Sequence, residues 1–311
     1  MGLHHEKARE SEMMFVQLTT SGGGAWLSGS LTLSGSWTHS GATLALLSEG
    51  TISGGGSLFV SGGSLQKGNA TTSSLGVPLT CNTPSVLLVG DGPLALSGGG
   101  VWTCAVTTQG AGSLQFLAGT YFLNSPASLN GTAGSVVVGG SSVVRVNVAI
   151  ALGSATVVNV TSGSLFVNGN TTVTENAPLF VSSGVVAVTQ PTTFTSLVTV
   201  VGGTLNITAD VNLTGGIKLV SGSVYIIAGR VSVLGGVCSV SGGYLSVGAA
   251  QTLSLATGCS FAGGTLDGAG SVSVTSPLAW SGGTWAGSGT LNLQATLTVN
   301  GSVSLQRSVR R

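Results

Sequence analysis

The chain has 311 residues, of which 52 are glycine and only 5% are charged, and its formal net charge is +1. Neither a run of about 18 apolar residues nor a basic stripe is present, so we expect no membrane-spanning helix and no nucleic-acid partner. The hydrophobic share of 42% lies in short alternating runs of Val, Leu and Ala, a regularity that argues against a disordered chain.

Residues 1–19 are expected to form a polar N-terminal tail. Five of the seventeen charged residues lie in the first twelve positions, and the segment lacks the apolar core of a signal peptide. His4 and His5 are adjacent there, and we interpret them as part of a solvated tail rather than as metal ligands.

A β composition begins at residue 20. The segments 30–33, 43–46 and 57–60 alternate apolar and polar residues between glycines, which predicts strands with one inward face. Between residues 64 and 92 this alternation is lost in a polar stretch that contains Pro78 and Pro84. We expect an irregular excursion from the regular coil at 64–92, a place where a partner could bind.

Residues 198–305 repeat about every twenty positions. Each unit contains three apolar doublets and a Gly-Gly or Ser-Gly pair, and one apolar column reads Val200, Leu219, Val240, Phe261, Trp280. A period near 20 with three short strands is typical of a triangular solenoid coil. One coil alone cannot bury enough apolar surface, so the coils are expected to stack into a continuous core.

These patterns predict an all-β fold: a single-stranded parallel β-helix (β-solenoid) with triangular coils of roughly twenty residues and about twelve turns over residues 20–305. Residues 306–311 contain three arginines and are expected to form a basic C-terminal tail. Because no capping helix follows the last coil, we expect the chain to be a fragment of a larger extracellular protein.

Four cysteines are present. Cys238 and Cys259 fall in the same inward column one unit apart, and neighbours in a parallel ladder lie about 4.8 Å apart. This spacing allows either a disulfide or two buried free thiols. Cys81, in the expected excursion, could be bonded to Cys104. Because the Cys and His spacings do not match a zinc motif, we expect no metal and no other cofactor.

One sequence run resembles a known class of surface proteins. It reads Phe261-Ala-Gly-Gly-Thr-Leu-Asp-Gly-Ala-Gly-Ser-Val-Ser-Val and is echoed from Trp280 onward. This run, like Ser28-Gly-Ser-Leu-Thr-Leu-Ser-Gly, resembles the β-strand repeats of autotransporter passengers and filamentous-haemagglutinin-type adhesins. The resemblance covers most of residues 26–305, implies a parallel β-helix with a surface role in adhesion or display, and carries over no functional residue.

The β-helix class that this chain resembles also contains polysaccharide lyases and hydrolases, so an enzymatic role is an alternative. Such enzymes need clustered carboxylates for acid–base chemistry, whereas the internal carboxylates here are scattered. Asp210 and Arg230 are expected to be neighbours at one corner, which we interpret as a surface ion pair. We therefore predict that the chain is not an enzyme, and a polysaccharide-degrading β-helix remains as an alternative.

A binding face is predicted on the third strand of each coil. Its outward positions form a ladder of small neutral polar groups that could bind carbohydrate, ice or a cell-surface protein. The members of this ladder are Asn212, Ser232, Ser254, Ser273 and Asn292. We predict a structural or adhesive role in the extracellular space or on a cell surface, with a carbohydrate- or ice-binding face as the alternative.

Seven Asn-X-Ser/Thr sequons occur. We expect glycosylation at Asn69, Asn159, Asn206 and Asn212, of which the last three fall on predicted outward strand positions. Use of these sequons would make the protein an extracellular glycoprotein.

Overall fold

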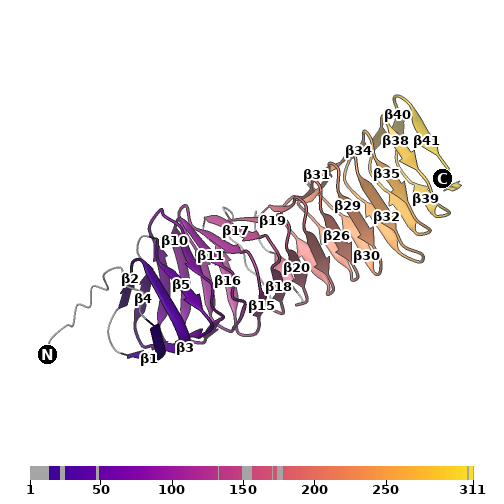
Figure 1. The fold of residues 1–311 in the computed structure, drawn as a ribbon. Coiled ribbons are helices and arrows are strands. Elements are labelled where there is room, and N and C mark those ends of the chain that lie inside the picture. Colours follow the sequence, from indigo (N-terminus) through magenta and orange to yellow (C-terminus); the bar gives the residue numbers. More distant parts are fainter. Residues whose placement is uncertain are drawn as a thin grey trace.

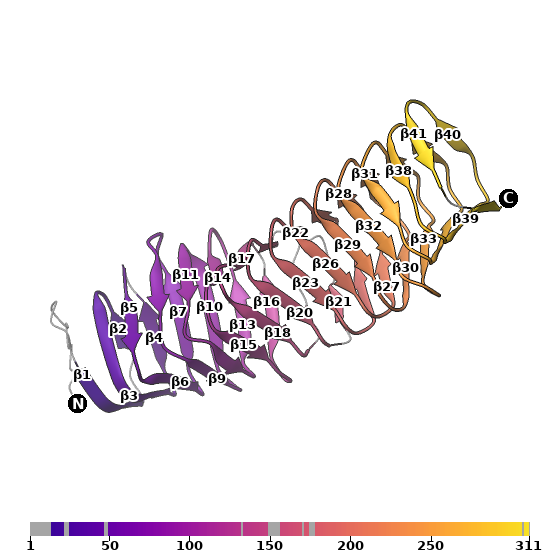
Figure 2. The ribbon, with the colours of Figure 1, turned by 45° about the vertical axis from the view of Figure 1, so that its right-hand side comes forward.

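The computed structural model is a long parallel β-solenoid, and all of its regular elements in the described residues are strands (Figure 1). The structure describes residues 14–21, 25–46, 49–131, 133–148, 156–169, 171–173, 178–306 and 308–310. The strands lie across the long axis and stack along it, so that β1 and β40 lie at opposite ends (Figure 2). The predicted all-β parallel solenoid is confirmed.

Three stacked faces form the coil, and all pairings between turns are parallel. The first face contains β5 (Thr51–Gly54), β8 (Ser73–Leu75), β11 (Pro93–Leu96), β14 (Ser113–Phe116), β17 (Gly134–Val138), β19 (Thr156–Val160), β22 (Leu179–Val181), β25 (Val198–Val200), β28 (Gly216–Leu219), β31 (Val237–Val240), β34 (Cys259–Phe261), β37 (Leu278–Trp280) and β40 (Leu297–Val299). The second face contains β6 (Ser57–Ser61), β9 (Leu79–Asn82), β12 (Gly100–Trp102), β15 (Thr120–Leu123), β18 (Val143–Val146), β20 (Ser164–Val167), β23 (Val185–Val188), β26 (Thr204–Ile207), β29 (Ser223–Ile226), β32 (Tyr244–Val247), β35 (Thr265–Asp267), β38 (Gly283–Trp285) and β41 (Val303–Leu305).

The third face consists of two ladders. The first ladder contains β2 (Ala25–Leu27), β4 (Thr43–Leu46), β7 (Ser64–Gly68), β10 (Val86–Asp91), β13 (Ala105–Thr108) and β16 (Ser128–Gly131). The second contains β21 (Thr171–Val173), β24 (Thr192–Phe194), β27 (Val211–Leu213), β30 (Arg230–Val233), β33 (Thr252–Leu255), β36 (Ser271–Val274), β39 (Thr290–Leu293) and β42 (Ser308–Arg310). The first-face ladder of thirteen strands, β5 to β40, agrees with the predicted number of about twelve turns.

Two long strands precede this regular ladder. β3 (Ser30–Ser40) pairs with both β5 and β6 and therefore extends across the first and second faces, and β1 (Met14–Ser21) pairs along β3. The polar tail was predicted for residues 1–19, but residues 14–19 belong to β1. The sequence of β1 is rich in the β-branched, aromatic and aliphatic residues that suit a strand. Residues 1–13, including His4 and His5, lie outside the described residues.

Inward side chains of successive turns form continuous buried columns. Val200 pairs with Leu219, Leu219 with Val240, and Val240 with Phe261, and these four side chains are at most 3% exposed. The predicted stacking of this column is therefore confirmed. In most strands buried residues alternate with half-buried or exposed ones, as in β29 and β33, so hydrophobic burial fixes which face of these strands points inward.

Glycines form a column at the corner between the first and second faces. A Cβ on Gly222 would lie 2.3 Å from the carbonyl oxygen of Gly203 one turn below, closer than nonbonded atoms can approach. The next corner residue, Gly243, also has a φ of +79°, in the left-handed region that favours glycine. The Gly-Gly and Ser-Gly pairs of the repeat are thus required where the backbones of adjacent turns meet.

The excursion expected at residues 64–92 is absent, because these residues form β7 to β10 within the ladders. β7 pairs with β4 on one side and β10 on the other. The apolar alternation is interrupted in the sequence because a polar residue occupies a core position. Lys67 points inward and is 1% exposed. Pro78 and Pro84 lie between strands, where the missing N–H removes no ladder hydrogen bond.

The C-terminal region also remains in the coil. β42 pairs with β39, and Val309 lies opposite Leu291 in the third-face register. The expected basic tail over 306–311 is therefore corrected, since Ser308, Val309 and Arg310 continue the third face as a strand. Residues 307 and 311 lie outside the described part of the chain.

Candidate functional site

The predicted binding ladder forms one straight column on the outside of the third face. Asn212 pairs with Ser232, Ser232 with Ser254, Ser254 with Ser273, and Ser273 with Asn292. Asn212 is exposed and the other four are half-buried. Thr252 precedes Ser254 by two positions and pairs with Arg230 and Ser271 on the adjacent turns. These residues form a second outward column beside the first, at the spacing of alternate strand residues, about 6.7 Å.

A different group of residues stands out on the second face. Phe122, Arg145 and Phe166 occupy the central outward position of β15, β18 and β20 and are direct neighbours in the parallel register. The guanidinium carbon of Arg145 lies 4.4 Å from the centroid of the Phe166 ring, within the range of a cation–π interaction. All three side chains are half-buried.

A row of asparagines runs beside these three residues in the same three turns. The side-chain amide of Asn147 donates to the amide oxygen of Asn124 at 2.7 Å, and the amide of Asn168 donates to Asn147 at 3.1 Å. The hydroxyl of Thr189 continues the row by donating to Asn168 at 2.9 Å. Each asparagine lies two positions after the aromatic or Arg residue of its own turn. We call Phe122, Arg145, Phe166, Asn124, Asn147 and Asn168 together the Arg145 patch.

Further along the second face, two tyrosines lie on adjacent turns. The rings of Tyr225 and Tyr244 have centroids 5.7 Å apart. The hydroxyl of Tyr244 donates to Asp267 at 2.6 Å. This hydrogen bond raises the pKa of Tyr244, and partial burial adds to the increase.

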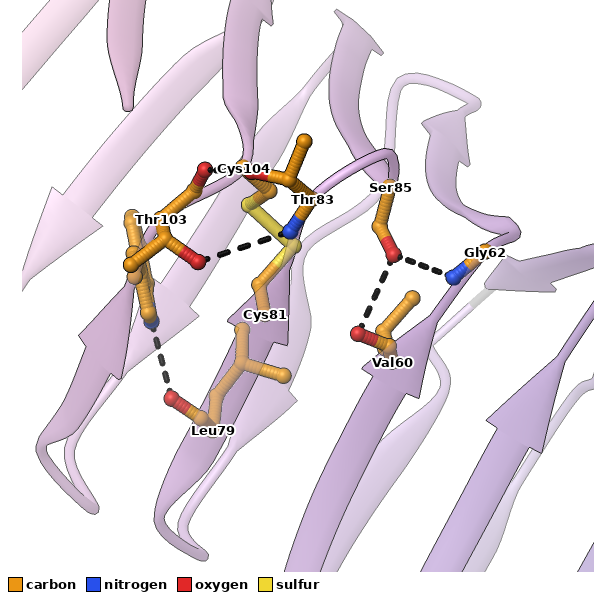
Figure 3. Close-up of a disulfide and its surroundings, with 9 residues drawn as sticks. Val60, Gly62, Leu79, Cys81, Thr83, Ser85, Thr103 and Cys104 are labelled. Carbon is orange, nitrogen blue, oxygen red and sulfur yellow. Dashed lines mark hydrogen bonds between the residues drawn. A yellow bond between two sulfur atoms is a disulfide. The ribbon is translucent and has the colours of Figure 1, made fainter. Parts of the chain in front are cut away.

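The four cysteines form two disulfides, each between neighbouring turns. Cys81 of β9 is bonded to Cys104 in the corner after β12, with 5.5 Å between their Cα atoms (Figure 3). Beside this disulfide, the N–H of Thr83 donates to the hydroxyl of Thr103 at 3.4 Å, and the hydroxyl of Thr83 donates to the carbonyl oxygen of Thr103. The corners of two adjacent turns are thus joined by covalent and hydrogen bonds.

The second disulfide joins Cys238 and Cys259, whose Cα atoms are 4.6 Å apart. They are register partners in β31 and β34, as their shared column predicted. Of the two alternatives left open by the sequence, the structure has the disulfide rather than the free thiols.

Ser85, in the corner between β9 and β10, forms hydrogen bonds to the preceding turn. Its buried hydroxyl donates to the carbonyl oxygen of Val60 at 3.1 Å and accepts from the N–H of Gly62 at 2.8 Å (Figure 3). Because both contacts reach back one turn, this polar residue of the supposed excursion is part of the coil's packing.

Lys67 is the one lysine among the fully buried side chains of the described core. It lies between Leu46 and Val89 in an inward column. Its ammonium contacts the backbone and side-chain oxygens of Asn69 and lies 3.3 Å from the carbonyl oxygen of Asp91. Burial lowers the pKa of Lys67, and the negative charge of Asp91 offsets part of this decrease.

The residues considered for catalysis do not converge on one another. Asp210 accepts a hydrogen bond from the backbone N–H of Arg230 at 2.7 Å, so the predicted contact between these two residues is made by the backbone of Arg230. His39 is fully buried, and its Nε2 lies 3.0 Å from the carbonyl oxygen of Ala42. Within the part of the chain that the structure describes, no group of three His, Cys, Asp or Glu residues could hold a metal ion.

The four expected glycan acceptors differ in accessibility. Asn212 is exposed on β27, whereas Asn69, Asn159 and Asn206 are half-buried. The side-chain oxygen of Asn69 contacts the Lys67 ammonium, and that of Asn159 accepts from Ser182 at 3.0 Å. Asn212 is therefore the acceptor with the best access for a glycan, and glycosylation itself stays a prediction.

Sequence reasoning missed the Arg145 patch because it aligned the repeats closely only from residue 158 onward. The sequence feature that could have revealed the patch is an aromatic residue between the two inward apolar positions of a second-face strand, as in Tyr121-Phe122-Leu123 and Leu165-Phe166-Val167. Among the half-buried aromatic side chains of the described residues, five lie outward on the second face and one on the first. They are Phe59, Phe122, Phe166, Tyr225 and Tyr244, with Phe180 on the first face.

Searches against family models, curated proteins and solved structures found no match to this chain. The part of the chain that the structure describes contains no helical segment that could span a lipid bilayer.

Proposed function

We propose that this chain is a structural and adhesive rod that acts in the extracellular space or on a cell surface. The observation that carries this proposal is the unbroken first-face ladder from β5 to β40, in which each turn is bonded to the next. A continuous ladder over a continuous core resists bending and holds distant surface groups at fixed spacing. These are the properties required of a spacer that presents binding groups.

The two disulfides support the proposed location. Disulfides form and persist in oxidising compartments such as the extracellular space. Both bonds here join turns that are already neighbours in the coil. They stabilise the rod without altering its repeat, and the exposed sequon at Asn212 is compatible with the same location.

Bead adhesion under flow tests the proposal. Beads that carry the folded protein would be passed over surfaces coated with polysaccharides, glycoproteins, matrix proteins or cells. We expect retention on at least one surface and its loss when the bead-bound protein is reduced, alkylated and unfolded. Retention equal to that of uncoated beads on every surface would contradict an adhesive role.

A second candidate function is docking of the third face on ice or on neutral carbohydrate. The straight column from Asn212 to Asn292, with Thr252 beside it, is the observation that favours it. Inhibition of ice recrystallisation and binding to a neutral glycan array would test the two ligands. Ser254→Lys interrupts the column at its centre, so we expect this variant to lose any activity that depends on it.

A further inference from the structure

Arg145 is electrostatically isolated. It is the only charged residue between Asp91 and Glu175 in the sequence. The strands next to it along the second face, β15 and β20, both belong to this neutral stretch. Within the described residues, its guanidinium contacts the Phe166 ring and has no hydrogen-bond acceptor. A guanidinium has five N–H donors in a geometry that matches a carboxylate, so this group is available to an external anion.

The phenyl rings of Phe122 and Phe166 add an aromatic surface on either side of the Arg145 guanidinium. Phe122 and Phe166 flank Arg145 from the turns on either side, so they are separated by two inter-strand spacings, about 9.6 Å. Aromatic faces carry partial negative charge and therefore attract the weakly positive C–H groups on the face of a pyranose ring. Successive sugars of a linear glycan lie at a spacing comparable with that of the strands.

The asparagine row supplies hydrogen-bonding groups alongside the two phenyl rings. Each amide has two N–H donors and an oxygen with two lone pairs, and the contacts within the row use only part of this capacity. Asn147, at the centre, is exposed. A protein partner would favour a larger apolar centre, whereas isolated rings, a cation and amides fit the hydroxyls and carboxylates of a glycan.

We propose that the Arg145 patch binds a carboxylate-bearing glycan, with Arg145 on the carboxylate, the two phenyl rings on flanking sugars, and the amide row on hydroxyl groups. This inference rests on the proposed adhesive function and names its ligand class. The patch lies on the second face, so it is separate from the third-face ladder.

Three polymers separate charge from sugar recognition. Polygalacturonate carries both pyranose rings and carboxylates, its methyl ester keeps the rings without the charge, and polyglutamate keeps the charge without the rings. We expect the folded full chain to bind polygalacturonate at least about tenfold more tightly than either of the other two, the factor that corresponds to about 1.4 kcal/mol. Equal binding of the methyl ester would overturn the role of Arg145, and equal binding of polyglutamate would point to an acidic protein instead.

Matched variants locate the binding. Arg145→Gln is expected to weaken polygalacturonate binding about tenfold or more, because it removes the charge-assisted hydrogen bonds from the guanidinium to the carboxylate. Phe166→Ala should also weaken it. Lys218→Gln removes an exposed positive charge from β28 on the first face and should leave binding unchanged. Equal effects of R145Q and K218Q would overturn the proposal.

The bead experiment distinguishes this inference from the function on which it rests. Beads that adhere to some surface, but equally well with wild type and R145Q, would leave the adhesive role intact and contradict the Arg145 patch as its site. Circular dichroism and the melting temperature of each variant would show that the coil is folded.

Discussion

The indole rings of Trp280 and Trp285 stack inside one turn, with centroids 4.9 Å apart and planes inclined by 25°. At the end of the second strand, the register position that Val247 holds in an earlier turn is taken by Gly268 and then by Gly287, two residues after Trp285. Since protein interiors are close-packed, two large rings require small residues beside them. The structure places both rings in the core at 1–2% exposure.

Gly287→Ala should destabilise the protein strongly. Gly287 has a φ of +86°, and a Cβ there would lie 2.3 Å from the carbonyl oxygen of Gly268. The left-handed conformation alone costs a non-glycine residue about 1–2 kcal/mol, so we expect a loss of about 2 kcal/mol or more in the free energy of unfolding, measured by urea titration. Gly258→Ala is the matched control, because its nearest neighbour would be Pro277 at 3.7 Å. A loss equal to that of Gly258→Ala would contradict the steric account.

Both disulfides should be present in the protein purified without a reducing agent. A thiol titration of the unfolded, unreduced chain should find no free thiol, and four free thiols would contradict the structure. The double variant Cys238→Ala, Cys259→Ala should lose about 3 kcal/mol of stability, as expected from the loop entropy of a bond that closes a segment of about twenty residues. A reducing agent should lower the melting temperature of the wild type by more than that of this variant, which retains only the Cys81–Cys104 disulfide.

The buried ammonium of Lys67 should make stability depend on pH. Burial lowers its pKa in the folded state, so between that value and the higher unfolded value the unfolded state binds more protons. Stability therefore increases as the pH rises through this window. We expect Lys67→Met to remove this dependence, which urea titrations at a series of pH values would measure. An identical pH profile for wild type and variant would contradict it.

Lys67→Met and Lys67→Ala also separate packing from charge. Met fills the column between Leu46 and Val89 with a side chain of similar length, and replacing a buried charge by an apolar group is often neutral or stabilising. Ala leaves a cavity and should cost about 2–4 kcal/mol. Equal losses for the two variants would show that the ammonium contacts, rather than the packing, stabilise this position.

Tyr121 should cause a loss of stability at high pH. Its side chain is 1% exposed and packs against Phe116 at 4.7 Å between ring centroids, and burial raises the pKa of Tyr121 to about 12. Between about pH 10 and about pH 12 the unfolded state releases this proton first, so stability decreases with rising pH, by about 2–3 kcal/mol in total. Tyr121→Phe should remove this part of the alkaline loss. Superimposable profiles for the two proteins would contradict the assignment.

Where the apolar alternation was clear, the sequence alone was sufficient to predict the fold. Val200, Leu219, Val240 and Phe261 could be aligned because each follows the same local pattern, and the structure stacks them in register. The third-face column from Asn212 to Asn292 could be predicted for the same reason. The apolar alternation did not predict the strand at Lys67, because lysine counts as a polar residue in such a pattern. In the structure its aliphatic stem packs in the core and oxygen atoms of Asn69 and Asp91 contact its ammonium.

Strand periodicity is a local property, so the sequence by itself determined which residues point inward and that the coils stack. In the turns before residue 158, only the tertiary structure decided which outward residues of different turns become neighbours, since corners of unequal length shift the alignment between these units. Phe122, Arg145 and Phe166 are separated by 23 and 21 positions, and register across three turns brings them together. For Cys238 and Cys259 the sequence predicted that the two residues are neighbours, but ladder spacing allowed either a disulfide or two thiols. The position of the sulfur atoms in the folded coil decided for the disulfide.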